Sequence, residues 1–268
     1  MVLPSSLLLL ALSPAMAYAA LFPKSSKVKV VDANGFKKAM EINGTSLVAF
    51  VAPWCGHCQR LVPEYSKAAE SLNPLISSYA VDCDEEANKR LCHEQDVKGF
   101  PTMKLFPRGK HLAPITYEGE RTAGAIFKFA SLRVPNGPDK IMKTSDIKPW
   151  IKKHKKSIRT LLLTKDSKVP LLWKVLASKY HGRLRFGTHR DEKNVAGPEV
   201  GVSLGEAKSK VLVFSEGSQD PSVYEGKTKL KELTQFFDSV LDGSAELKPV
   251  RAKSETEGES VEPPKDEL

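Results

Sequence analysis

The residues of this chain best suited to chemistry are Cys55 and Cys58, two of its four cysteines. They belong to the motif W-C-G-H-C, residues 54–58, which directly follows the apolar run 47–52. This order predicts a buried strand that leads into a helix, and a helix N-terminus has free N–H groups and a partial positive charge that stabilise a thiolate. We therefore expect Cys55 to be an exposed nucleophile and Cys58, one turn inside the helix, to be its resolving partner.

Two thiols at this spacing can cycle between a dithiol and a disulfide. In thiol–disulfide exchange a thiolate attacks a disulfide sulfur and forms a mixed disulfide, which a second thiol can resolve. Gly56 and His57 separate the two cysteines, and an imidazolium at His57 would stabilise the Cys55 thiolate and make the disulfide more oxidising. The motif thus predicts a redox enzyme that needs no metal and no cofactor.

The two ends of the chain predict the compartment. Residues 1–19 combine the apolar run 7–12 with small residues at 15–19, the pattern of a cleaved secretory signal, and the run is too short for a membrane anchor. The chain ends in an endoplasmic-reticulum retention signal formed by Lys265, Asp266, Glu267 and Leu268. We therefore expect the protein in the lumen of the endoplasmic reticulum, with the K-D-E-L receptor as a partner, where disulfides form and persist.

Length and composition divide the rest of the chain. The sequence has 268 residues, and removal of the signal leaves a length that suits two domains. The turn-rich stretch 134–138 is the expected boundary, which gives a first domain over 20–135 and a second over 136–243. Residues 244–268 are rich in Glu, Ser, Pro and Lys and lack aromatic side chains, so we expect a disordered acidic tail.

Alternating strands and helices are expected in the first domain. The expected strands cover residues 27–31, 46–52, 75–81, 102–106 and 115–118. The expected helices cover residues 34–40, 55–72, 85–93 and 122–132. Asn34 is expected to cap the first helix, and Pro63 to kink the second. This order predicts a mixed sheet flanked by helices, an α/β fold.

The segment 52–58, A-P-W-C-G-H-C, resembles the active-site signature of the protein disulfide isomerase family, whose catalytic domains have a thioredoxin fold. The resemblance covers about residues 25–133. It includes the segment 100–102, similar to the family's cis-proline loop, and the segment 117–122, similar to the family's segment with a mobile arginine. The plan of the whole chain also resembles the two-domain fungal members of this family. It consists of one active thioredoxin domain, one domain without active-site cysteines and a K-D-E-L tail.

The resemblance implies roles for further residues. Pro101 would be cis and would place the backbone edge of Phe100 where an extended substrate can pair with it, beside Trp54. Arg121 would be the mobile arginine that stabilises Cys58 as a thiolate. The family's strand usually has a buried glutamate where this chain has Ala49 and a lysine partner where it has Ala80, so we expect slower turnover here.

The implied function is that of a thiol–disulfide oxidoreductase and isomerase, which forms and rearranges disulfide bonds in secretory proteins. Its partners would be unfolded or misoxidised secretory proteins and an upstream thiol oxidase or glutathione. The alternative is a lumenal chaperone or adaptor that acts mainly by binding proteins.

Cys83 and Cys92 flank the end of an expected strand and about two helical turns. We favour a structural disulfide between them over a second redox pair, because the short loop makes the bond sterically feasible. A zinc site built from all four cysteines is the third interpretation, and the oxidising compartment and the spacing disfavour it.

The second domain is expected to be thioredoxin-like, with K-D-S-K at residues 165–168 where the cysteine pair would lie. Its expected helices cover 145–154, 168–180 and 230–241, and its expected strands cover 157–163, 184–187, 210–214 and 222–224.

Two surface features leave alternatives open. The segment 139–210 has 18 lysines and arginines against 7 acids, densest at 152–156. This run is a solvated helix end or a site for an acidic lumenal chaperone, and nucleic acid is not an expected partner. Asn43 begins the only N-x-[ST] sequon, and the sequence leaves open whether it carries a glycan.

Overall fold

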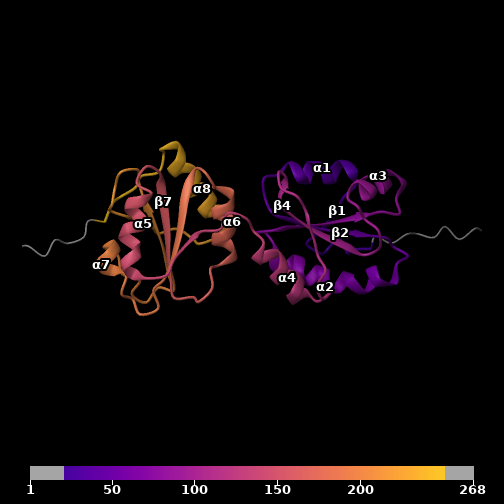
Figure 1. The fold of residues 1–268 in the computed structure, drawn as a ribbon, viewed down its shortest axis with the longest axis horizontal. Coiled ribbons are helices and arrows are strands. Elements are labelled where there is room, and N and C mark those ends of the chain that lie inside the picture. Colours follow the sequence, from indigo (N-terminus) through magenta and orange to yellow (C-terminus); the bar gives the residue numbers. More distant parts are fainter. Residues whose placement is uncertain (1–20, 251–268) are drawn as a thin grey trace, which may run out of the picture.

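The computed structural model describes residues 21–250 (Figure 1). The expected signal peptide at 1–19, the retention residues 265–268 and most of the expected tail lie outside the described residues.

The first unit is built on one mixed sheet of five strands. Its strands are β1 (Val28–Val30), β2 (Ser46–Val51), β3 (Ser77–Asp82), β4 (Thr102–Lys110) and β5 (Ile115–Thr116). In space they follow the order β1-β3-β2-β4-β5. β2 lies parallel to β3 and antiparallel to β4, so the strand that precedes the cysteine pair is at the centre of the sheet.

Helices cover both faces of this sheet. They are α1 (Ala33–Glu41), α2 (Gly56–Leu72), α3 (Glu86–Glu94) and α4 (Ala123–Leu132). α1 and α3 lie on one face and α2 and α4 on the other (Figure 1). All six residues of β2 are buried, because a central strand with helices on both faces has no solvated side.

The second unit repeats this plan. Its strands are β6 (Asp139–Ile141), β7 (Ile158–Thr164), β8 (Leu184–Arg190), β9 (Ser209–Phe214) and β10 (Ser222–Tyr224). Their order, β10-β9-β7-β8-β6, is the order of the first sheet read from its other edge. Its helices are α5 (Ile147–Lys153), α6 (Leu171–Lys179), α7 (Gly197–Val200) and α8 (Leu230–Asp242). The predicted fold class, two thioredoxin-like α/β units in tandem, is confirmed.

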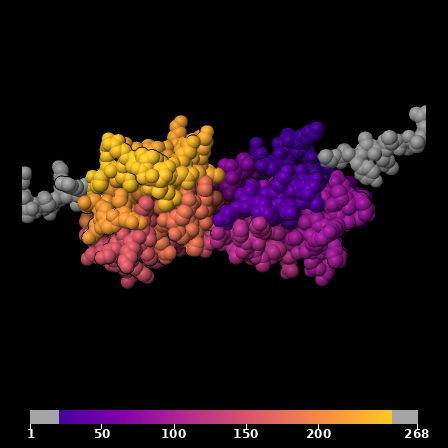
Figure 2. All heavy atoms as spheres, turned by 90° about the horizontal axis from the view of Figure 1, so that it is seen from above, coloured from indigo at the N-terminus to yellow at the C-terminus, as the bar shows by residue number. Residues whose placement is uncertain are grey.

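The two units lie side by side and touch (Figure 2). Leu171 and Val175 of α6 pack against the core beneath α2 and α4. The ammonium group of Lys174 donates a hydrogen bond to the carbonyl oxygen of Ser131, at the end of α4, over 3.3 Å. The second unit thus contacts the first through α6, the helix that would follow a cysteine pair.

Two predicted helix starts are wrong for identifiable reasons. α1 is capped by Asp32, whose extended backbone lets its carboxylate accept the N–H of Gly35 at 2.7 Å, so Asn34 lies inside the first turn. α6 begins at Leu171 rather than at Lys168, because a residue that precedes a proline avoids helical geometry and Pro170 follows Val169.

Two short elements were missed. They are β6, with three residues, and α7, with four. Within residues 21–250, no helix combines the length and apolar character needed to cross a membrane.

Candidate active site

Cys55 and Cys58 lie at the N-terminus of α2, after the central strand β2. Cys55 is the N-cap residue, and its carbonyl oxygen accepts the N–H groups of Cys58 at 2.9 Å and Gln59 at 3.1 Å. Both cysteines are free thiols. Cys55 is 8% exposed and Cys58 is fully buried. The expectation of an exposed Cys55 needs correction, because the loop that contains Phe100 packs against this thiol and leaves only a small part of it open.

The surroundings of Cys55 favour its thiolate. Burial opposes ionisation, but the Cys58 thiol donates a hydrogen bond to its sulfur, and the backbone N–H groups of Cys58 and His57 do the same. The positive charge of Arg121 adds to these effects. Together they lower the pKa of Cys55 below its ordinary value, as expected for a thiol at a helix N-terminus.

The surroundings of Cys58 have the opposite effect. Burial is the largest cause, and the neighbouring Cys55 thiolate adds to it, so that the pKa of Cys58 is raised to about 12. A backbone hydrogen bond at Ala52 and the charge of Arg121 oppose this rise. The two thiols are therefore unequal, with Cys55 poised to attack and Cys58 holding its proton.

His57 and Gly56 differ in what the structure shows of them. The contribution of His57 to Cys55 comes from its backbone N–H, while its ring Nδ1 lies 2.9 Å from a guanidinium nitrogen of Arg60. The stabilisation by an imidazolium stays a prediction. Gly56 begins α2, and a Cβ atom there would meet only the Arg60 guanidinium, at 3.7 Å. Packing within the chain therefore does not require a glycine at this position.

A loop and an exposed ring flank the reactive thiol. The peptide bond between Phe100 and Pro101 is cis, and the carbonyl oxygen of Phe100 lies 3.6 Å from the sulfur of Cys55. Trp54 is 63% exposed, and its ring meets that of Phe100 edge-on at a centroid distance of 6.1 Å. The indole N–H of Trp54 donates to the carboxylate of Asp84 over 3.0 Å.

Asp84 is a residue of this site that the sequence interpretation missed. Asp84 lies two residues after the end of β3. Because β3 runs parallel to β2, the end of β3 lies at the same edge of the sheet as the cysteine pair that follows β2. A carboxylate two residues after a parallel strand that neighbours the motif was the available signal.

Ala49 and Ala80 are direct partners on the parallel strands β2 and β3. Both are buried, and both belong to the same core cluster as Cys58. Neither side chain can ionise, so no carboxylate is available from these two positions to take the proton of Cys58. Beside them the Tyr65 hydroxyl lies 2.9 Å from the carbonyl oxygen of Tyr79, and burial keeps the pKa of that phenol well above its usual range.

A disulfide joins Cys83, just after β3, to Cys92 in α3, with 6.0 Å between their Cα atoms. A zinc site that uses all four cysteines is incompatible with this bond, because a disulfide sulfur is not a thiolate ligand. Residues 21–250 also contain no group of three or more His, Cys, Asp or Glu side chains arranged to hold a metal ion.

Asn43 lies on the loop between α1 and β2 and is exposed. Its side-chain oxygen accepts a hydrogen bond from Arg108 at 2.9 Å, whereas the buried Thr45 hydroxyl donates to the Pro107 carbonyl. The sequon therefore lies before β2, and the thiol pair lies after it, at opposite ends of the strand.

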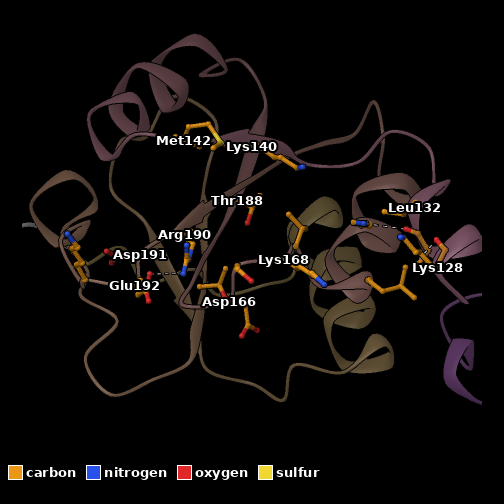
Figure 3. Close-up of a pocket in the computed structure, with 18 of the residues that line it drawn as sticks. Lys128, Leu132, Lys140, Met142, Asp166, Lys168, Thr188, Arg190, Asp191 and Glu192 are labelled. Carbon is orange, nitrogen blue, oxygen red and sulfur yellow. Dashed lines mark hydrogen bonds and ion pairs between the residues drawn. The ribbon is translucent and has the colours of Figure 1, made fainter. Parts of the chain in front are cut away.

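A cavity of about 1070 Å³ lies on the second unit where the cysteine pair would be, bordered by the loop after β7 (Figure 3). Lys128 and Leu132 of α4 also line the cavity, at the end away from Asp191 and Glu192. Five lysines line the cavity and form no ion pair with any described residue: Lys128, Lys140, Lys168, Lys174 and Lys193. The run 152–156 lies elsewhere, at the end of α5.

Comparisons with known proteins agree with this architecture. The thioredoxin family model matches residues 27–131. The chain is 33% identical to protein disulfide-isomerase MPD1 of Saccharomyces cerevisiae over 82% of its own length and 80% of that protein. It is 28% identical to protein disulfide-isomerase 2-3 of Arabidopsis thaliana, with 84% and 57% covered.

Other similarities are more partial. A Schizosaccharomyces pombe thioredoxin domain-containing protein, named as mitochondrial, is 35% identical over 56% of this chain, which spans 42% of that protein. The crystal structure of ERdj5 form I is 17% identical with a TM-score of 0.46, over 82% of this chain and 30% of that one. The thioredoxin match and the similarity to MPD1 over most of both chains establish that the chain belongs to the protein disulfide isomerase family.

Proposed function

We propose that this protein is a thiol–disulfide oxidoreductase and isomerase that forms and rearranges disulfide bonds in secretory proteins through Cys55 and Cys58. The observation that supports this most is the opposite shift of the two thiol pKa values. Cys55 is favoured as a thiolate, while Cys58 keeps its proton with a pKa of about 12. A reactive thiol beside a silent one is what catalysis through a mixed disulfide needs.

The reaction begins when the Cys55 thiolate attacks a substrate disulfide. A bond forms between the Cys55 sulfur and one substrate sulfur, and the other substrate sulfur leaves as a thiolate. For isomerisation, a different substrate thiolate attacks the mixed disulfide and releases the Cys55 thiolate, so that no electrons are gained or lost. Because Cys58 is protonated, the mixed disulfide persists long enough for this rearrangement.

A trapped substrate is released when Cys58 loses its proton and attacks the Cys55 sulfur. This step forms the Cys55–Cys58 disulfide and leaves the substrate as a dithiol. Oxidation of a substrate is the reverse: the enzyme disulfide takes two electrons from a substrate dithiol, and a thiol oxidase or oxidised glutathione restores it. With Ala49 and Ala80 at the neighbouring positions, deprotonation of Cys58 depends on Arg121, water or the substrate.

Substrate would bind across the face that holds the reactive thiol. The exposed Trp54 ring offers an apolar contact, and the backbone of Phe100 and Pro101 offers an edge to an extended polypeptide. Gly56 leaves the approach to Cys55 free of a side chain. We assign to His57 the role of stabilising the Cys55 thiolate.

We further propose residence in the endoplasmic-reticulum lumen, with the domain limits, cleaved signal, retention signal and two-domain fungal plan expected from the sequence. The names of the isomerase relatives support the secretory assignment, and the mitochondrial name of the S. pombe relative makes a direct test necessary. Imaging of an internally tagged protein provides it. Deletion of residues 265–268 should cause secretion, and a mitochondrial signal would refute the assignment.

A second candidate function is the binding of acidic polypeptide segments by the second unit, as in a chaperone or adaptor. The cavity beside α4 favours it, because its lining combines five lysines that form no ion pair within residues 21–250 with the exposed apolar side chains of Leu132 and Met142. Charge reversal by Lys168→Glu with Lys140→Glu should weaken capture of an acidic peptide, and added salt should do the same. Binding that neither change affects would refute this function.

Two cysteine variants test the leading proposal. Cys55→Ser should abolish the reactivation of a scrambled disulfide protein, because no mixed disulfide can form. Cys58→Ser should retain part of the isomerisation and accumulate mixed disulfides with substrate. Full client maturation by both variants would show that protein binding, rather than redox chemistry, is the main activity.

A further inference from the structure

The start of α4 is held by a side chain from another helix. The first N–H groups of a helix have no partner within it, and α4 has no acidic residue in its first turn. The Thr122 side chain accepts the N–H of Ala125 at 3.3 Å, which leaves the N–H groups of Ala123 and Gly124. The Glu64 carboxylate accepts that N–H at 2.8 Å, although Glu64 lies 59 residues earlier in the chain.

Glu64 belongs to α2, the helix that carries the thiol pair. One helix therefore holds both Cys58 and the carboxylate that fixes the beginning of α4. The residue directly before this fixed point is Thr122, and the one before that is Arg121. The position of Arg121 relative to the thiols is thus set in part by Glu64.

A second contact restrains the other side of Arg121. The Tyr117 hydroxyl donates a hydrogen bond to the carbonyl oxygen of Glu120, and the Tyr117 ring packs edge-on against Phe129 of α4 at 4.7 Å. Arg121 is consequently the exposed residue between two anchored ones, with Glu120 on one side and the start of α4 on the other.

The charge of Arg121 acts on both active-site thiols. It is among the causes that lower the pKa of Cys55, and it opposes the rise in the pKa of Cys58. The energy between two charges falls with their separation, so this effect depends on where the arginine is held. Glu64 is suited to hold Arg121 in place, because its carboxylate reaches from α2 to accept the N–H of Ala123 at 2.8 Å, two residues after Arg121.

We propose that Glu64 is a positioning residue for thiol–disulfide exchange, which keeps Arg121 near Cys55 and Cys58 through its hydrogen bond to Ala123. The inference rests on the proposed function for its biological meaning, but it concerns the ionisation of the thiols and not their turnover. Glu64 acts through geometry here, so an uncharged acceptor of the same length should replace it.

The test compares Glu64→Ala with Glu64→Gln in the reduced full chain. Thiolate absorbance and the rate of alkylation of Cys55 are measured against pH, with Glu70→Ala as the control. Glu70 is an exposed acid on the same helix, so its removal changes the charge without touching α4. Glu64→Ala should raise the pKa of Cys55 by about half a unit, which lowers its alkylation rate about threefold below that pKa. Glu64→Gln and Glu70→Ala should titrate like the unaltered protein.

Three results would overturn the proposal. A Glu64→Ala protein that melts earlier but titrates normally would limit Glu64 to stability. A lowered pKa of Cys55 in both Glu64→Ala and Glu64→Gln would show that the negative charge of Glu64 acts directly on the thiol. A full Glu64→Ala effect in an Arg121→Ala background would show that the arginine is not the intermediary. If the proposed function itself is wrong, the unaltered protein will show the expected thiol titration but will exchange no disulfides with substrates.

Discussion

Almost every Cys58 thiol carries its proton at neutral pH, so release of a trapped substrate should depend steeply on pH. Burial, followed by the Cys55 thiolate, raises the pKa of Cys58 to about 12. At pH 7 only a minute fraction of Cys58 is then a thiolate, and this fraction increases about tenfold with each pH unit below the pKa. Attack by Cys58 on a Cys55 mixed disulfide should therefore become about 100-fold faster between pH 7 and pH 9.

The perturbation is a pH jump applied to a mixed disulfide between Cys55 and glutathione. The assay follows released glutathione after rapid acid quenching, and Cys58→Ser provides the control because it has no attacking thiol. Burial is the largest cause of the shift and persists in the mixed disulfide, so the logarithm of the rate should increase linearly with pH. A rate that levels off below about pH 9 would contradict a raised pKa of Cys58, because this thiol would then titrate near the ordinary range.

Three further predictions concern the neighbours of the pair. Replacing Cys83 and Cys92 by alanine removes a disulfide between residues that are 9 positions apart in the sequence. The free energy of unfolding, measured by urea titration, should fall by about 2.6 kcal/mol, and an unchanged urea midpoint would contradict this. Ala49→Glu combined with Ala80→Lys should speed glutathione release from the mixed disulfide at pH 7, and an unchanged rate would show that a carboxylate there cannot take the proton. Asp84→Ala frees the Trp54 indole, and should raise KM for a peptide disulfide with little change in kcat; an unchanged KM would show that this hydrogen bond does not orient the ring.

The sequence predicted the parts of the site that depend on one local segment. The apolar run before Cys55 predicted the buried strand, and the motif itself predicted the start of α2. The cis state of Pro101 came from the family resemblance alone, since most bonds before proline are trans. The cis bond between Asn73 and Pro74 had no comparable motif and was not predicted.

The parts that were missed depend on contacts between distant segments. Glu64 reads as an ordinary helix-surface acid, and only the fold places it against Ala123. Asp84 likewise gains its role from the neighbouring strand end that holds Trp54. The low exposure of Cys55 arises from the Phe100 loop, which is 45 residues away in the sequence. Local propensity predicted where the thiols lie, and tertiary contacts determine how they are held.

The proposed function requires that Cys55 and Cys58 form a redox pair that exchanges with its surroundings. Equilibration of the protein with glutathione buffers of known composition, followed by thiol counting, measures this directly. Because the surroundings of Cys55 stabilise its thiolate, we expect a fully reversible disulfide with a potential near that of an isomerase, roughly −180 mV. A pair that never oxidises, or one that resists reduction below about −300 mV as structural disulfides do, would contradict it.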